Sequence, residues 1–226
     1  MSNPDLPPPP TSEAELMERC RAVAGRSLGQ LATQIGVEIP DDLRRAKGWV
    51  GQLVEAVLGA DAASLAEPDF RTIGVEMKTV PLDFKGRPRE STYVCTVPLE
   101  QGIGETWATS WARRKLARVL WVPVEAERDL SLPERRLGTP FLWSPDPGQE
   151  SILRTDWEEL MEMVCLGQLE SITARFGRAL QIRPKAANAR TMAAAIGPEG
   201  ERILTNPRGF YLRPSFTRAI LQQHFG

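Results

Sequence analysis

A cluster of charged residues lies in the segment EPDFRTIGVEMKTVP, residues 67–81. Alternate residues of a strand share a face, so Glu76 and Lys78 are expected to point together, away from the apolar residues between them. Asp69 precedes a Thr-Ile-Gly bend, which can bring its carboxylate alongside that of Glu76. Isolated charges are costly to bury, so the cluster is either a solvated sheet edge or a metal site.

The chemistry of a metal site here follows from the residue types. Two carboxylates at close range repel each other unless a divalent cation neutralises both. Hard oxygen ligands with room for water suit Mg²⁺, which can orient a phosphate oxygen and a nucleophilic water. Lys78 could stabilise the charge that develops on phosphorus. Asp, a gap of six, then Glu-x-Lys is a short pattern that occurs by chance in many proteins, so its meaning depends on the surrounding elements.

The surrounding elements form a mixed α/β pattern. In residues 41–60, DDLRRAKGWVGQLVEAVLGA, apolar residues recur at helical spacing, and small residues surround Glu55 on the opposite face. That carboxylate could be approached closely by another backbone, or it could be a solvated surface group. Strands are predicted at 73–80, 91–97, 119–124, 138–143, 180–183 and 209–213, and further helices twice within 11–40, within 106–118, at 152–166, at 191–196 and at the C-terminus.

Composition indicates a globular protein of one large domain or two lobes, because 42% of the 226 residues are hydrophobic and 25% are charged. Three distant cysteines without a CxxC pair are expected to be reduced thiols, which favours a cytoplasmic location. The sequence has no apolar run long enough to span a bilayer and no signal peptide, so no membrane partner is expected. Residues 1–10, MSNPDLPPPP, are predicted to be an extended proline-rich tail.

Charge is unevenly distributed, although the net charge is only −1. Residues 171–198 contain five basic residues and no acidic one, and residues 106–124 contain four basic residues and no acidic one. Residues 144–170 contain seven acids and one arginine. This distribution is typical of a protein with one side facing phosphates, but basic and acidic faces without a partner are the alternative.

Motifs in order along nearly the whole chain resemble the MutH family of DNA mismatch-repair endonucleases, within the PD-(D/E)xK nuclease superfamily. They are KGWVGQLVE, PDFRTIGVEMKTVP, RVLWVPVE, WSPDP, LGQLESITARFG, LQIRPKAANA and GERILTNPRGFYL. The resemblance implies a restriction-endonuclease-like α/β fold, with a mixed sheet flanked by helices and two lobes around a DNA cleft. Residues 11–105 would form the catalytic lobe and residues 106–226 the DNA-reading lobe of one nuclease domain.

The resemblance also implies an activity and its partners. The expected enzyme is a monomer that nicks the unmethylated strand of double-stranded DNA at hemimethylated GATC sites, with one or two Mg²⁺ ions. Activation would come from a MutL-type ATPase and, indirectly, from the mismatch sensor MutS.

Site residues are implied by motif matching. Asp69, Glu76 and Lys78 would be the catalytic core, with the Met77 backbone carbonyl as a further metal ligand and Glu55 near a second metal position. Lys47 and Lys115 would contact the scissile phosphate. DNA would also be contacted by Gly48, Tyr93, Tyr211 near the adenine, and the reading loop Arg183, Pro184, Lys185 and Ala186. Tyr93 departs from the phenylalanine that is usual in these relatives.

Other interpretations remain open on the residues alone. The lysines could be solvated, Tyr211 could be a packing aromatic, and the reading loop could be a turn. A stand-alone restriction endonuclease cutting at GATC would need two active sites per duplex and no activator. A DNA-binding module that has lost cleavage is a third hypothesis, against which the intact Asp69, Glu76 and Lys78 argue.

Overall fold

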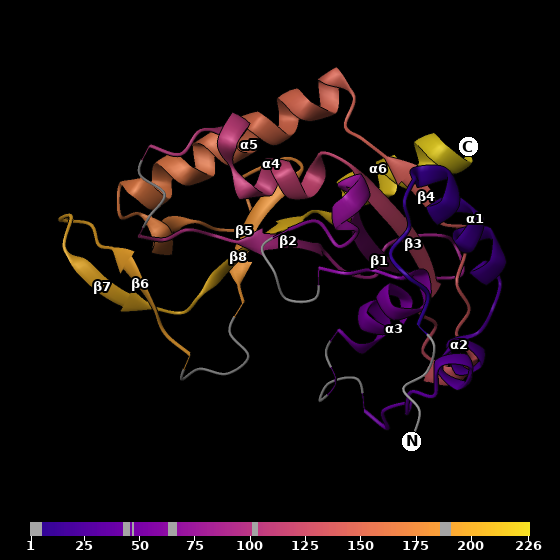
Figure 1. Cartoon of the computed structure of the whole chain (residues 1–226). Helices are drawn as coiled ribbons and strands as arrows, with labels where there is room; N and C mark the ends of the chain where they lie inside the picture. The colour runs from indigo at the N-terminus through magenta and orange to yellow at the C-terminus, as the bar shows by residue number, and fades with distance from the viewer. Residues whose placement is uncertain (1–5, 43–45, 47, 63–66, 101–103, 186–190) are drawn as a thin grey trace. The chain divides into compact units, whose positions relative to one another are not determined.

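The computed structural model describes the chain except residues 1–5, 43–45, 47, 63–66, 101–103 and 186–190 (Figure 1). The chain divides into two compact units, unit 1 with residues 1–89 and 118–144, and unit 2 with residues 90–117 and 145–226. The units thus alternate along the sequence. No helix within the described ranges has the length and apolar character needed to cross a membrane.

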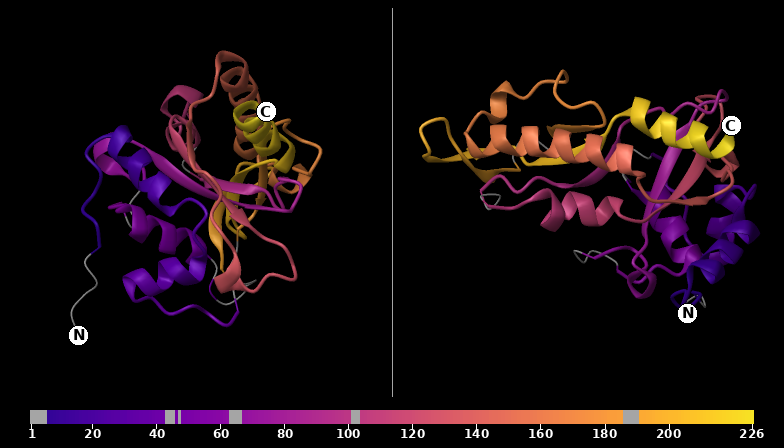
Figure 2. Two further views of the ribbon diagram at one scale, coloured as in Figure 1. Left: turned by 90° about the vertical axis from the view of Figure 1, so that its right-hand side faces the viewer. Right: turned by 90° about the horizontal axis from the view of Figure 1, so that it is seen from above.

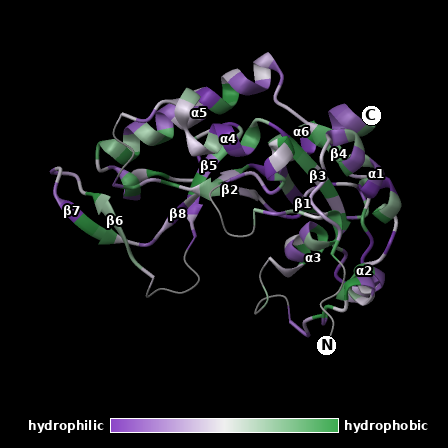
Figure 3. Cartoon of the chain, viewed as in Figure 1, coloured by the Kyte–Doolittle hydropathy of each residue, from purple (hydrophilic) through white to green (hydrophobic). Residues whose placement is uncertain are grey.

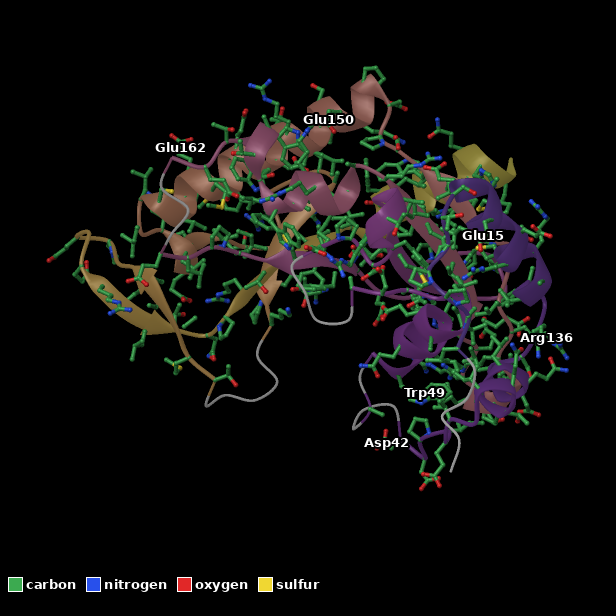
Figure 4. All side chains as sticks on the ribbon, viewed as in Figure 1. Glu15, Asp42, Trp49, Arg136, Glu150 and Glu162 are labelled. Atoms are coloured by element: carbon green, nitrogen blue, oxygen red, sulfur yellow. The ribbon has the colours of Figure 1, made fainter. Side chains whose placement is uncertain are left out.

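The first two helices of unit 1 begin at serines that cap them. Ser12 accepts the backbone N–H of Glu15, and Ser27 forms a reciprocal capping box with Gln30. Residues 6–10 of the expected proline-rich tail form neither helix nor strand. The three helices are α1 (Glu13–Val23), α2 (Leu28–Ile35) and α3 (Trp49–Leu58), and Figure 4 shows Trp49 at the start of α3.

The sheet of unit 1 has the order β1-β3-β4 and consists of β1 (Glu76–Leu82), β3 (Val119–Glu125) and β4 (Phe141–Trp143). β3 runs parallel to β1 and antiparallel to β4, and every residue of β3 except the last is buried. Figure 3 accordingly shows β3 as a hydrophobic strand. One face of this sheet, which includes Met77, Leu120 and Val122, shares a core with the three helices. The register places Glu76 and Lys78 on the other face.

The sheet of unit 2 has the order β2-β8-β5, with β8 antiparallel to both neighbours. Its strands are β2 (Thr92–Thr96), β5 (Leu180–Pro184) and β8 (Arg208–Leu212), and its helices are α4 (Trp111–Leu116), α5 (Pro147–Cys165) and α6 (Pro214–Phe225). α5 lies against β5 and extends over the sheet (Figure 2). Figure 3 shows hydrophobic and hydrophilic residues alternating along α5, and the buried residues Leu153, Trp157, Leu160 and Val164 form an apolar stripe at helical spacing. Glu150 and Glu162 lie near opposite ends of the helix (Figure 4).

The helix predicted at 191–196 is wrong. This segment forms β6 (Ala193–Ile196), which pairs antiparallel with β7 (Arg202–Thr205), a strand that the sequence pattern did not reveal. Alanine favours helix, but six residues make fewer than two turns, and so short a helix is marginal. The backbone is instead satisfied across a turn in which the N–H of Gly197 donates to the carbonyl of Glu201 at 2.8 Å. Single 3₁₀ turns lie at Arg71–Ile73, Trp107–Thr109, Leu132–Glu134 and Leu169–Ser171.

Candidate active site and nucleic-acid interface

Asp69 lies before a tight reversal of the chain. Phe70 and Val75 exchange backbone hydrogen bonds of 2.9 and 3.2 Å across the 3₁₀ turn at 71–73. The carboxylate of Asp69 accepts the backbone N–H of Met77 through Oδ2 at 2.8 Å. The bend therefore brings Asp69 to the beginning of β1, beside Glu76, as the sequence predicts.

The backbone of Met77 faces the same edge of β1 as Asp69. In a strand, the N–H and C=O of one residue point to the same side. The N–H of Met77 points to Asp69, whereas the N–H of Glu76 donates to the carbonyl of Arg118, at the start of β3, at 2.9 Å. The Met77 carbonyl is consequently directed away from β3 and towards the edge of β1 where Asp69 lies. A metal ion bound by Asp69 would need an oxygen ligand at this edge.

Glu76 and Lys78 point together from one face of β1, as the alternation predicts. The Lys78 Nζ lies 2.5 Å from the Glu76 Oε1, and the two side chains are only 13% and 3% exposed. A carboxylate with 3% exposure is not part of a solvated sheet edge. Its burial requires a compensating positive charge, and the ammonium of Lys78 lies against it. The burial of Glu76 therefore argues against the solvated-edge interpretation.

The third predicted carboxylate, that of Glu55, lies on α3. A Cβ placed on Gly51 would lie 3.8 Å from the Glu55 Oε1 and 4.0 Å from the Thr79 Oγ1, so Glu55 extends back along α3 near β1. Thr79 shares the face of Met77, opposite to that of Glu76. Within the described part of the chain, no three His, Cys, Asp or Glu side chains gather where they could hold a metal ion. Asp69 lies at the edge of β1 beside the Met77 backbone, and Glu76 lies on the face of the same end of the strand.

A second group of predicted residues lies on one face of the sheet in unit 2. The register aligns Tyr93 of β2 and Gln181 of β5 with Tyr211 of the central strand β8, and Thr96 and Arg183 with Gly209. The opposite face is apolar, with Leu180, Phe210 and Leu212 buried. We call the polar side the tyrosine face; it consists of Tyr93, Thr96, Gln181, Arg183 and Tyr211.

Two aromatic rings meet on the tyrosine face over a glycine. Tyr93 and Tyr211 are in edge-to-face contact, with ring centroids 5.3 Å apart. A Cβ on Gly209 would lie 2.9 Å from the Tyr93 Cε2 and 3.0 Å from the Tyr211 Cε2. The missing side chain at Gly209 thus allows both rings to lie over the backbone of β8. Burial, followed by the proximity of Tyr93, raises the pKa of the Tyr211 phenol, which is neutral at physiological pH.

Cations accompany both rings. The guanidinium of Arg183 lies 5.9 Å from the centroid of the Tyr211 ring and donates to the Ser91 Oγ at 3.1 Å. The ammonium of Lys185 lies 4.0 Å from the centroid of the Tyr93 ring and donates to its hydroxyl. Cations interleaved with aromatic rings on an exposed sheet face can bind phosphates while the rings contact bases.

Comparison with known proteins identifies relatives of this chain. The sequence profile of the family described as "DNA mismatch repair enzyme MutH" matches residues 58–156. The DNA mismatch repair protein MutH of Serratia proteamaculans (strain 568) is 56% identical over 220 residues, covering 97% of this chain and 96% of that protein. The protein of the same name from Salmonella paratyphi A (strain ATCC 9150 / SARB42) is 56% identical over 220 residues, covering 97% of this chain and 95% of that protein.

The chain belongs to the MutH family.

Membership of the MutH family confirms the restriction-endonuclease-like α/β fold and the DNA endonuclease activity expected from the sequence. It also establishes that the chain takes part in DNA mismatch repair. Nucleases of this family generally depend on a divalent metal. The carboxylates and carbonyl beside β1 are all hard oxygen donors, which fits such an ion.

The remaining predicted residues have different surroundings. Lys47 and Ala186 lie outside the described residues. Gly48 is the N-cap of α3, with a left-handed φ of 87° and no side chain to cap the helix. Pro184 is exposed at the end of β5. Lys115 lies on α4, where its Nζ is 5.1 Å from the centroid of the Trp111 ring.

Sequence reasoning missed the residues that hold the tyrosine face in place. Ser91 accepts from Gln181 at 2.8 Å as well as from Arg183, and Thr96 accepts from Lys185 at 3.2 Å. Neither residue has a local signal, because each contact joins strands about 90 positions apart. Asp156 was missed as well, although an acid within the apolar stripe of α5 does signal a buried carboxylate.

Proposed function

We propose that this chain nicks the unmethylated strand at hemimethylated GATC sites, with Mg²⁺ as cofactor, after activation by a MutL-type ATPase that responds to MutS. The observation that carries the hydrolytic part is the assembly of Asp69, Glu76 and Lys78 at the start of β1, with one carboxylate buried. The specificity is supported by the cations and phenols of the tyrosine face. Activation by a MutL-type ATPase and MutS is supported by membership of the family.

The metal would be held by Asp69, Glu76 and the Met77 carbonyl, with Glu55 serving a second ion if one binds. When bound, Mg²⁺ polarises a phosphate oxygen and lowers the pKa of a coordinated water. Lys78 contributes the charge of its ammonium, which lies against Glu76 and can stabilise negative charge that develops on the phosphoryl group. The backbone N–H of Met77 keeps the Asp69 carboxylate at the strand edge, so the ligand pair needs little rearrangement.

The tyrosine face supplies groups suited to a GATC site. A guanidinium or ammonium matches the O6 and N7 acceptors of guanine in the major groove, and Arg183 and Lys185 carry these groups at the end of β5. Tyr211 is a stiff ring beside them, with Arg183 packed over it. A methyl group added to N6 of adenine occupies space and removes a donor hydrogen, and a rigid ring in contact with that position would sense both changes.

One experiment tests the proposed function. The protein is incubated with Mg²⁺ and a hemimethylated GATC plasmid, with and without a MutL-type ATPase. We expect nicking of the unmethylated strand, greatly increased by the ATPase. Double-strand cutting without the ATPase would instead indicate a stand-alone restriction endonuclease, and binding without any cut would indicate a DNA-binding module.

The choice of strand is expected to depend on the ring of Tyr211. Tyr211→Ser should allow the methylated strand to be nicked, because a side chain without a ring no longer penalises the methyl group. A close base contact is worth about 1 to 3 kcal/mol, so the preference should fall by roughly tenfold to a hundredfold. The measurement is the nicking rate on unmethylated, hemimethylated and fully methylated duplexes, with Tyr211→Phe as the control that keeps the ring. Full preference in the serine variant would assign Tyr211 to packing alone.

The phosphate contacts proposed for Lys47 and Lys115 predict a change in salt dependence. Each phosphate neutralised by a lysine releases about one counterion, so Lys115→Ala should reduce the slope of log affinity against log salt by about one unit. Lys47→Ala should act in the same way. Arg154→Ala is the charge-matched control, because Arg154 is exposed on α5 and paired with Glu158 at 2.7 Å. An unchanged slope in both lysine variants would remove these residues from the interface.

A further inference from the structure

The ammonium of Lys185 is held on the tyrosine face by two hydroxyl groups. It donates to the Tyr93 hydroxyl and, at 3.2 Å, to the Thr96 Oγ1, and these two hydroxyls are themselves 3.1 Å apart. The same ammonium lies 4.0 Å from the centroid of the Tyr93 ring. A lysine side chain has four flexible bonds, so three simultaneous contacts remove much of its freedom.

The backbone at Lys185 is also fixed. Its N–H donates to the carbonyl of Pro207 at 2.8 Å, which continues the pairing of β5 with β8 one residue beyond the strand. Both ends of the Lys185 side chain are consequently tied to the sheet. A lysine whose backbone and ammonium are both held can place its charge at one position of a ligand. A lysine with a mobile side chain would spread its charge over many positions.

A bulge in β2 makes the two hydroxyls available. The register of β2 shifts between Tyr93 and Cys95, so that Tyr93 lies opposite Tyr211 and Thr96 lies opposite Gly209. Residues three apart in a regular strand would point to opposite faces. The additional residue in β2 puts Tyr93 and Thr96 on the same face, and bulges commonly redirect side chains at functional sites.

Tyr93 touches the fixed cation and the second ring at the same time. Its hydroxyl and ring contact Lys185, and its ring meets that of Tyr211 at a centroid distance of 5.3 Å. Displacement of the Tyr93 ring would thus disturb both the cation and the aromatic contact. Gly209 leaves no side chain that could separate the two rings.

We propose that Tyr93 is a specificity-determining positioning residue, whose hydroxyl, together with that of Thr96, holds Lys185 in the orientation that reads a base edge. The inference rests on the proposed function, because it assigns a base-reading role to Lys185. Tyr93 acts through Lys185 and not through a contact of its own hydroxyl with DNA. The hydroxyl of Tyr93 therefore matters only while the lysine is present.

A double-mutant cycle tests this dependence. Tyr93→Phe, Lys185→Met and the double variant are compared for binding to a GATC duplex and to a duplex in which the guanine is replaced, with Ca²⁺ in place of Mg²⁺ to prevent cleavage. Since a hydrogen bond to a charged group is strong, Tyr93→Phe should reduce the preference for GATC by about tenfold. The double variant should be no worse than Lys185→Met alone. Thr96→Val should show a smaller loss of the same kind.

A second measurement examines the lysine without DNA. The rate of acylation of Lys185 by an amine-reactive ester, followed by mass spectrometry of the peptides, should rise several-fold in Tyr93→Phe because the amine is released. Lys85 is the matched internal control, since its Nζ lies 5.3 Å from the centroid of the Phe84 ring, which carries no hydroxyl. Its rate should be the same in both proteins.

Three results would overturn the inference, and they differ from a failure of the proposed function. Additive losses in the cycle would show that the Tyr93 hydroxyl acts independently of Lys185. Equal losses on both duplexes would show a general contribution to DNA affinity and none to specificity. An unchanged acylation rate would show that the hydroxyl does not hold the amine. A wild-type protein with no preference for GATC would refute the proposed function and the specificity role together, while the acylation rate would still decide the contact.

Discussion

Replacing Asp69 or Glu76 by alanine should reduce strand nicking by about 10³-fold or more, because a divalent cation supplies several kcal/mol of transition-state stabilisation and each 1.36 kcal/mol is a factor of ten. Affinity for DNA should remain similar, since neither carboxylate attracts phosphate. The measurements are single-turnover nicking of a GATC plasmid and binding of the same duplex without cleavage. Removal of the metal with a chelator should have the same effect on the unsubstituted protein.

The chain offers a matched control two residues before Asp69. Glu67 is an exposed carboxylate paired with Arg71 at 2.5 Å, so Glu67→Ala removes the same charge from the same segment without touching β1. Its nicking rate should remain within a few-fold of the unsubstituted rate. Normal cleavage by either Asp69→Ala or Glu76→Ala would refute the assignment of the active site.

Lys78→Ala should also abolish nicking, but its interpretation needs a stability measurement. The substitution leaves the Glu76 carboxylate buried without the ammonium that lies against it. A loss of activity with an unchanged unfolding midpoint would indicate a chemical role, whereas a loss that follows unfolding would indicate a structural one. Lys78→Arg keeps the charge and distinguishes the need for a cation from the need for this amine.

Local physics made the geometry at the start of β1 predictable. Strand alternation placed Glu76 and Lys78 on one face, and the Thr-Ile-Gly bend placed Asp69 beside them. The caps at Ser12 and Ser27 were equally local, since each joins residues three positions apart. Such features depend on short stretches of chain, where residue type alone determines the geometry.

Features that depend on strand pairing were not predictable. The alanines of β6 individually favour helix, and their pairing with β7 makes the segment a strand. The two units alternate along the chain because β3 and β4 form a sheet with β1 in unit 1. Residues 90–117, which lie between β1 and β3 in the sequence, belong to unit 2. The bulge that puts Tyr93 and Thr96 on one face is visible only from the pairing of β2 with β8.

The buried carboxylate of Asp156 combines a local feature, its position on α5, with contacts to residues that are distant in sequence. Its position in the apolar stripe of α5 was visible in the sequence, but its partners lie 22 to 24 positions further along the chain. It accepts the backbone N–H groups of Arg178, Ala179 and Leu180 at 2.6 to 2.9 Å. These residues lead into β5, which carries Arg183 and ends immediately before Lys185.

Arg213 also binds the loop that precedes β5. Its guanidinium donates to the carbonyls of Ala174, Phe176 and Gly177 at 2.5, 2.7 and 2.8 Å. The loop before β5 thus has its carbonyls bound by a cation and its N–H groups bound by an anion. Both charges are satisfied by backbone dipoles, which allows Asp156 to be 2% exposed.

Asp156→Ala is therefore expected to cause the largest loss of stability among the substitutions considered. Three N–H donors would lose their acceptor, and those of Ala179 and Leu180 are buried. Each unsatisfied buried donor costs about 1 to 3 kcal/mol, so the free energy of unfolding should fall by about 3 to 5 kcal/mol. Asp156→Asn should cost less, because one amide oxygen can still accept. The measurement is urea unfolding, in which such a loss moves the midpoint by about 1 to 3 M.

Glu159→Ala is the control for the charge and helix propensity of α5, since Glu159 is exposed on the same helix, and its effect should stay within about 0.5 kcal/mol. An equally small effect of Asp156→Ala would mean that water replaces the carboxylate and that the loop does not depend on it. If Asp156→Asn folds but loses preference for GATC, the start of β5 must be held in place for Arg183 and Lys185 to read DNA. Preserved preference in that variant would show that the pairing of β5 with β8 suffices to position both cations.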